Sequence, residues 1–125
     1  MNGNMTILDS NTIIYLSKRV LSVDDIFIDK DDSYAISVIT YMEILGYDFN
    51  STEEENFIKK LLSYLDILYI DEMIANEVIN LKRKYKIKLP DAIICTTAIL
   101  NDATLVTNDI RLKNIEKLKL KIIGV

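Results

Sequence analysis

The chain has no histidine, and its 125 residues include only three glycines, one proline and one cysteine. The missing histidine excludes Ser-His-Asp and Cys-His triads, His-ligated zinc, and histidine acid–base cleavage of RNA. The scattered glycines, Gly3, Gly46 and Gly124, cannot build a glycine-rich phosphate-binding loop. The single cysteine, Cys95, cannot form an intramolecular disulfide. Any catalysis must therefore rest on carboxylates, lysines, hydroxyls or a metal ion.

The remaining composition is that of an ordinary globular domain, with 50% hydrophobic and 27% charged residues. The length suits one domain, and we expect residues 1–125 to form it. Short, interrupted apolar runs predict no membrane span, and the N-terminus does not have the pattern of a signal peptide, so we expect a cytoplasmic protein. The net charge of −4 argues against a protein that coats nucleic acid electrostatically. It leaves room for one that meets nucleic acid at a small metal-loaded site.

The hydrophobic pattern alternates between strand and helix along the whole chain. Strands are predicted at residues 6–8, 34–39, 67–70, 104–107 and 119–123. Helices are predicted at residues 12–21, 41–47, 53–65 and 72–85, from Pro90 onward, and at 110–115. Such alternation predicts a parallel sheet covered by helices on both faces. In such folds the reactive crevice lies beyond the carboxyl ends of the strands.

Two acidic residues near the ends of the first two strands have both a structural and a functional interpretation. Asp9 directly follows the first strand, where it suits a helix N-cap as well as a catalytic role. Glu43 completes a capping box with Thr40, with Ile39 and Ile44 as its hydrophobic staple. Taken alone, Glu43 is therefore better explained as part of a helix cap.

Two further acids lie near the fourth strand. Asp91 stands just inside a helix opened by Pro90, where the helix dipole favours a carboxylate. The helix behind Asp91 is apolar on nearly every side and should be buried, so its carboxylate is costlier than a surface cap, which favours a functional role. Asp109 follows the fourth strand, and either Asn108 or Asp109 is suited to cap the next helix.

Together these four acids indicate a shared site, which none of them indicates alone. Three of them follow strands that end at the same rim of a parallel sheet. Carboxylates gathered there would repel one another unless protons or cations offset them. Oxygen-only ligands suit Mg²⁺ or Mn²⁺, and one or two such ions could activate water for displacement at phosphorus. Thr107 could hold a metal-bound water or be an ordinary strand-end threonine. Asp71 also follows a strand, and spacing alone does not separate it from the cluster.

Four segments resemble, in order, the motifs of PIN-domain nucleases, and among these the VapC-type toxins of VapBC toxin–antitoxin systems: "ILDSNTIIYL", "ISVITYMEIL", "KLPDAIICTTAIL" and "TLVTND". Each motif is weak alone, but four in the right order are specific, and together they span the chain. The resemblance implies a three-layer α/β/α domain with a central parallel sheet of about five strands in the order 3-2-1-4-5. That order places Asp71 on an edge strand, as a helix cap outside the cluster.

The resemblance also implies an activity, a Mg²⁺-dependent endoribonuclease that leaves 5′-phosphate and 3′-hydroxyl ends. Ser37 and Thr107 match neighbouring positions of the motifs, and Glu43 would act as a ligand or a base. The residues that the resemblance assigns to Mg²⁺ binding are Asp9, Glu43, Asp91 and Asp109.

One departure from the family pattern concerns the fourth motif, which often carries a second acid where this chain has Arg111. Arg111 could weaken the binding of a second metal ion, contact a phosphate, or simply be solvated. The number of metal ions therefore stays open. The basic run at residues 82–88 could guide an RNA backbone, although the dipole-matched end of a helix explains it better in an acidic chain.

The resemblance further implies partners, namely an RNA substrate, a small antitoxin that fills the active-site groove, and a second copy in a homodimer. A rival interpretation is a receiver-type phosphoryl-accepting domain, with Asp71 and Thr107 after the third and fourth strands. That interpretation leaves Glu43 and Asp91 without a role, and the usual acidic pair after the first strand is missing. A third is a degenerate PIN-like binding module without activity, for which Arg111 is the hint.

Overall fold

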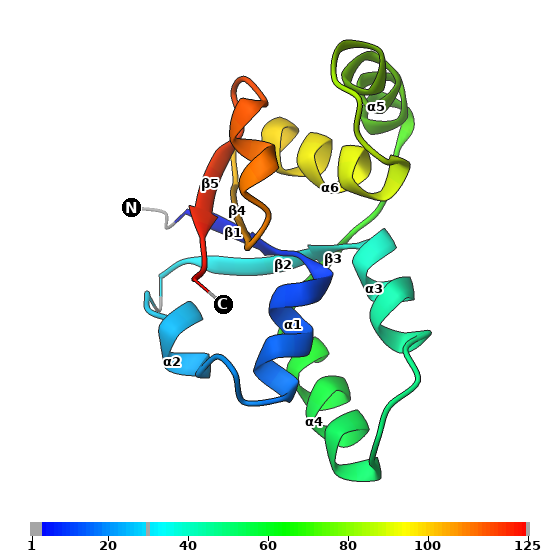
Figure 1. The fold of residues 1–125 in the computed structure, drawn as a ribbon. Coiled ribbons are helices and arrows are strands. Elements are labelled where there is room, and N and C mark those ends of the chain that lie inside the picture. The colour runs from blue at the N-terminus through cyan, green and yellow to red at the C-terminus, as the bar shows by residue number, and fades with distance from the viewer. Residues whose placement is uncertain (1–3, 30, 125) are drawn as a thin grey trace.

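The computed structural model describes residues 4–29 and 31–124, and these contain a sheet of five parallel strands (Figure 1). The strand order is β3-β2-β1-β4-β5, which confirms the order 3-2-1-4-5 expected from the resemblance. The strands are β1 (Met5–Leu8), β2 (Ser33–Ser37), β3 (Asp66–Leu68), β4 (Thr104–Thr107) and β5 (Lys119–Ile122). Because β1 lies between β2 and β4, the segments that follow these three strands emerge side by side.

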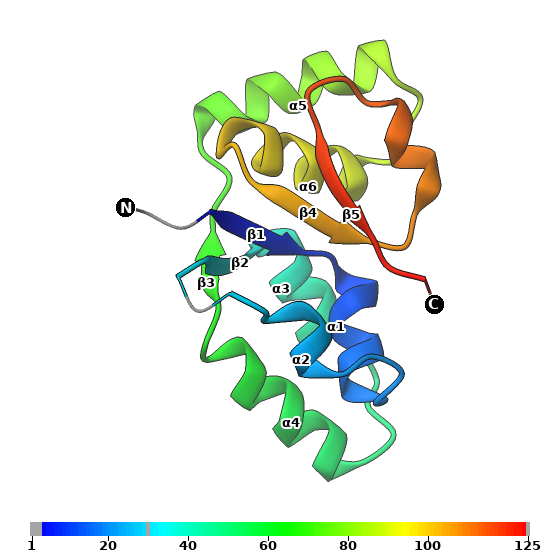
Figure 2. The ribbon, with the colours of Figure 1, turned by 90° about the vertical axis from the view of Figure 1, so that its left-hand side faces the viewer.

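Helices cover both faces of the sheet. Four lie on one side: α1 (Ser10–Ser17), α2 (Val23–Ile26), α3 (Val38–Leu45) and α4 (Thr52–Leu62). On the other side lie α5 (Glu72–Lys84) and α6 (Leu89–Leu100), as Figure 2 shows. A short 3₁₀ helix, η1 (Ile110–Asn114), connects β4 to β5. Of the helices in the described residues, none has the length and apolar character to cross a membrane.

Alternate strand residues feed two separate core layers. Leu8, Ile36 and Val106 face the layer that α1, α2, α3 and α4 complete. Their neighbours in sequence, which include Ile7 and Leu105, face the layer that α6 completes. Successive side chains of a strand point to opposite faces, so a strand covered on both sides must be apolar at nearly every position. This is the three-layer α/β/α arrangement that the sequence predicted.

Two predicted boundaries near the site are wrong. The helix predicted at 12–21 ends at Ser17, and Arg19 then adopts a positive φ of 59°, a conformation common where helices end. The strand predicted at 34–39 ends at Ser37, whose hydroxyl accepts a hydrogen bond from the amide of Ile39 (3.2 Å) and caps α3. The β-branched run that follows was taken for strand, but the serine cap turns it into the first turn of a helix.

Candidate active site

Asp9 joins β1 to α1 and is fixed there by the helix it caps. Its Oδ1 accepts hydrogen bonds from the backbone amide of Thr12 (2.8 Å) and from the Thr12 hydroxyl (2.7 Å). Its own backbone amide donates to the carbonyl of Val106 on β4 (3.3 Å), which ties the two strand ends together. The expected capping role of Asp9 is therefore confirmed. Both bonds to its carboxylate end on Oδ1, so Oδ2 is the oxygen better placed to bind a ligand.

Thr12 supports Asp9 from beneath and was not predicted as a site residue. Its side chain is fully buried, and its hydroxyl lies 2.7 Å from the Asp9 carboxylate and 3.1 Å from the Val106 carbonyl. A hydroxyl three residues after an N-capping acid, followed directly by Ile13 and Ile14, was the available sequence signal.

Glu43 reaches the same rim through Ser10, and its predicted capping role is wrong. The hydroxyl of Ser10 donates to Glu43 Oε1 at 2.6 Å, which brings Glu43 next to the segment that carries Asp9. Because α3 begins at Val38 after the Ser37 cap, Glu43 lies in its second turn and cannot form a capping box with Thr40. Ser37 is fully buried and serves as the cap, beneath the rim rather than in it.

Asp91 is the acid whose environment is most unusual. It lies in the first turn of α6, which begins at Leu89, one residue before the predicted start, and seven consecutive residues behind Asp91 are buried. Burial raises the pKa of Asp91, and the negative charge of Asp109 raises it further. Smaller contributions of the same sign come from Glu43 and Asp9, while Arg111 lowers the pKa. All four predicted acids therefore interact through one electrostatic environment.

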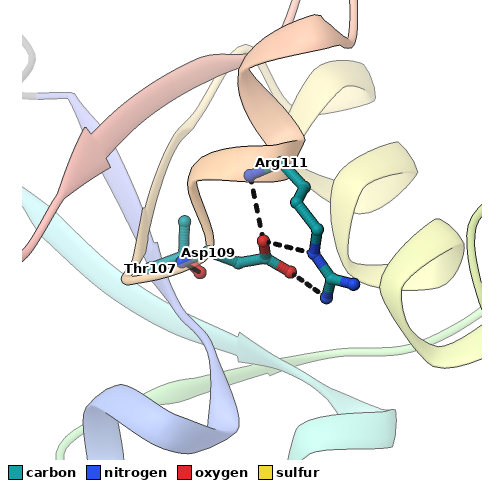
Figure 3. A network of polar contacts seen from close by, with 3 residues as sticks. All are labelled: Thr107, Asp109 and Arg111. Carbon is teal, nitrogen blue, oxygen red and sulfur yellow. Dashed lines mark hydrogen bonds and ion pairs between the residues drawn. The ribbon is translucent and has the colours of Figure 1, made fainter.

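Asp109 is held at the end of β4 by two neighbours (Figure 3). Its amide donates to the hydroxyl of the fully buried Thr107 (3.1 Å), so Thr107 shapes the turn. Arg111 donates from Nε to Oδ1 (2.9 Å), from Nη2 to Oδ2 (2.8 Å) and from its backbone amide to Oδ1 (3.0 Å). Hydrogen bonds from the Arg111 side chain are the main reason that the pKa of Asp109 is lowered. Arg111 is therefore paired with an acid rather than only solvated.

Two connected hollows surround these side chains. A small cavity of about 60 Å³, the acid cavity, is lined by three carboxylates, by two other polar residues and by three apolar ones. The carboxylates are those of Asp9, Asp91 and Asp109, the other polar residues are Asn11 and Thr107, and the apolar ones are Ile94, Leu105 and Leu112. A larger pocket of about 420 Å³, the basic pocket, shares Asp91 and Asp109 and adds three cationic side chains: Lys86, Lys88 and Arg111. Glu43 lines neither of them.

The donor set of the acid cavity fits a hard divalent cation. Carboxylate, hydroxyl and amide oxygens line it, which is the ligand chemistry that Mg²⁺ and Mn²⁺ prefer. Among the described residues, no three acidic or cysteine side chains lie close enough together to hold a metal ion as they stand. Cys95, on the next turn of α6, is buried with its pKa raised to about 12, so it remains a thiol and supplies no thiolate ligand.

Asp71, the acid that spacing alone could not separate from the cluster, lies elsewhere. Its carboxylate accepts a hydrogen bond from the amide of Ile74 (2.8 Å) and caps α5. It follows β3, the edge strand beyond β2. The prediction that Asp71 is a helix cap outside the cluster is confirmed.

Comparison with known proteins identifies the family of this chain. Residues 6–118 match the PIN domain family, and the chain therefore belongs to that family. A search of curated protein sequences finds no match.

Solved structures of toxin–antitoxin complexes share the fold. VapBC2 from Rickettsia felis, bound to a DNA fragment from its promoter, has a TM-score of 0.83 at 23% identity over 96% of this chain and 99% of the other. A toxin–antitoxin complex from Klebsiella pneumoniae has a TM-score of 0.71 at 29% identity over 90% and 94%. DNA-bound VapBC from Salmonella typhimurium has a TM-score of 0.80 at 22% identity over 98% of both chains. The resemblance stated from the four motifs is thus confirmed.

Proposed function

We propose that this chain is a Mg²⁺- or Mn²⁺-dependent endoribonuclease and the toxin of a type II toxin–antitoxin system, acting on RNA in the cytoplasm. The observation that carries the proposal is the acid cavity, which carboxylates from three separate segments line although they repel one another. Membership in the PIN domain family and the fold shared with VapBC complexes support it.

The four acids would have different roles according to their positions. Asp9, Asp91 and Asp109 would hold one or two cations, and Glu43 would add a ligand or accept a proton. When bound, a divalent cation supplies Lewis-acid chemistry, which makes water more acidic and offsets negative charge at phosphorus. Thr12 keeps Asp9 in a fixed orientation, with Oδ2 available. The expected products are 5′-phosphate and 3′-hydroxyl ends.

The substrate would reach these acids through the basic pocket. Lys86 and Lys88 belong to the loop between α5 and α6 and line the pocket beside Asp91. Cationic side chains next to a carboxylate site can bind the phosphates that flank a scissile bond, since phosphate contacts position a nucleic acid without reading its sequence. The chain can therefore have a net negative charge and still bind RNA locally.

The direct test compares three variants with the wild-type chain. Asp9→Asn and Asp91→Asn should each reduce RNA cleavage with Mg²⁺ or Mn²⁺ by at least about 100-fold, the upper end of what losing a residue that supports a metal ligand costs. Asp71→Asn is the matched control, because it alters an acid that follows a strand but only caps a helix. It should cleave RNA at the wild-type rate. Full activity of Asp91→Asn, or of the wild type in EDTA, would exclude the mechanism.

One observation favours a second candidate, a PIN-like binding module without activity. Arg111 engages both carboxylate oxygens of Asp109, one of the proposed ligands. A chain that neither cleaves RNA nor binds Mn²⁺ at millimolar concentration would support that candidate. The receiver-type interpretation gains no such observation, because its phosphoryl acceptor would be the helix cap Asp71.

Partners follow from the proposed role. We expect a small antitoxin to neutralise the chain, and we expect the chain to form a homodimer. If a neighbouring reading frame encodes the antitoxin, its co-expression should restore growth of cells that express this chain. Light scattering coupled to gel filtration measures the oligomeric state directly.

A further inference from the structure

Arg111 joins the acid cavity to the basic pocket. It lines the basic pocket, and its guanidinium binds Asp109, which lines both. The side chain of Arg111 is 81% exposed, whereas that of its partner Asp109 is 23% exposed. The carboxylate is thus held in place by the fold, and the guanidinium is the member of the pair that is free to move.

The pairing opposes cation binding at Asp109. Oδ1 accepts from Nε and from the backbone amide of Arg111, and Oδ2 accepts from Nη2. A divalent cation that takes Asp109 as a ligand competes with the guanidinium, because three of the roughly four lone-pair sites of the carboxylate already accept hydrogen bonds from Arg111. An exposed ion pair contributes little to stability, so breaking it costs little free energy. The affinity for the cation is nevertheless reduced by the free energy that the pair contributes.

The basic pocket offers the displaced guanidinium a second partner. Arg111, Lys86 and Lys88 line it together, and a phosphate of a bound RNA would be surrounded by all three. The planar guanidinium matches a phosphate in the same two-point manner in which it now matches the carboxylate.

We propose that Arg111 exchanges partners, holding Asp109 in the cation-free protein and binding an RNA phosphate in the basic pocket once a divalent cation takes Asp109. This inference rests on the proposed nuclease function and adds a coupling to it. Cation binding releases Arg111 for the RNA phosphate, so cation and RNA each raise the affinity for the other by the same factor. The substitution of arginine for the second acid of the fourth motif then becomes a device that links the two bindings.

The first measurement is Mn²⁺ binding without RNA, by isothermal titration calorimetry or by loss of the free-ion electron paramagnetic resonance signal. Arg111→Ala should bind Mn²⁺ about 3- to 5-fold more tightly than the wild type, the factor expected from losing an exposed ion pair. Arg111→Lys, which keeps the charge but not the two-point bond, should fall between them. Lys113→Ala is the matched control, a loss of one positive charge two residues further along η1, and should match the wild type.

The second measurement is RNA binding with and without cation. In EDTA, where Arg111 stays on Asp109, Arg111→Ala and the wild type should bind a short RNA equally. With Mn²⁺, the KM of Arg111→Ala for that RNA should rise about 3- to 5-fold. Thermal unfolding of each variant checks that the fold is intact.

Three results would overturn the exchange while leaving the nuclease proposal in place: unchanged or weaker Mn²⁺ binding in Arg111→Ala, equal tightening in Lys113→Ala, or weaker RNA binding by Arg111→Ala already in EDTA. A wild-type chain that binds Mn²⁺ but does not cleave RNA would instead overturn the nuclease proposal. A wild-type chain that binds no Mn²⁺ would overturn both.

Discussion

Replacing Thr12 with valine isolates the hydroxyl that orients Asp9. The change is nearly isosteric at a fully buried position, and it removes the 2.7 Å hydrogen bond to Asp9 Oδ1. A hydrogen bond to a charged group contributes about 1.5–3 kcal/mol. Three features reduce the net loss: the Thr12 amide still donates to Asp9 (2.8 Å), the Val106 carbonyl still accepts from the Asp9 amide, and valine gains apolar burial. We therefore expect Thr12→Val to lose about 1 kcal/mol of unfolding free energy, or roughly 4 °C in Tm.

The assay is urea unfolding of the cation-free protein, with Thr97→Val as the matched control. The Thr97 hydroxyl is also buried, but it donates to the backbone carbonyl of Ile93 (2.7 Å), so its loss should change the unfolding free energy by less than about 0.5 kcal/mol. A double-mutant cycle of Thr12→Val with Asp9→Ala then measures the pairwise interaction, expected at about 1 kcal/mol. Mn²⁺ affinity of Thr12→Val should fall about 10-fold, because the ligand is less well oriented.

The reasoning is refuted if Thr12→Val is no less stable than Thr97→Val and the cycle gives a coupling below about 0.3 kcal/mol, the scatter of additive mutations. Unchanged Mn²⁺ affinity would separately show that Asp9 needs no support from Thr12.

Three further outcomes follow from the same rim of acids. Because the pKa of Asp91 is raised in the folded state, its protonated form favours folding; that stability is complete below the ordinary value of 3.8 and is lost as the pH rises through the folded-state pKa. At pH 7 without cation, Asp91→Asn should thus have a higher Tm than the wild type, and the difference should shrink below pH 4; an equal or lower Tm at pH 7 contradicts this. Ser10→Ala should release Glu43 and reduce cleavage less than Asp91→Asn does, as measured by kcat; an unchanged kcat would mean that Glu43 needs no such anchor. Cys95, with its pKa raised to about 12, should react with iodoacetamide at pH 8 only as fast as the fold opens, and rapid labelling of native protein would refute its burial.

The fold could be predicted well because its signals are local and repeated. Apolar strands alternating with amphipathic helices predict a parallel sheet, and four ordered motifs add its strand order. The boundaries of the helices and strands were harder to predict. The run "SVITYMEIL" is rich in β-branched residues, yet it begins a helix after Ser37. A single side-chain hydrogen bond there outweighs strand propensity.

The nearness of several of the acids was predictable from the sequence, but their contacts were not. Topology placed Asp9, Glu43 and Asp109 at one rim, and the third motif added Asp91. Of these four, Asp9, Asp91 and Asp109 line one cavity and Glu43 does not. The hydrogen bond from Ser10 to Glu43 and the ion pair of Arg111 with Asp109 depend on rotamers, which no spacing rule gives. Whether these acids bind a cation stays a prediction.

The pairing of β1 with β4 has a consequence for how the protein is made. Leu8 pairs with Val106, so β1 leaves the ribosome well before β4, the neighbour that completes its pairing on one side. Asp9 is translated early, but the acid cavity cannot form until Asp91 and Asp109 have followed. If the chain is the ribonuclease proposed above, a ribosome would not be exposed to RNA cleavage by its own unfinished product. On that proposal, products that terminate before β4 should not harm the cell, whatever acids they already carry.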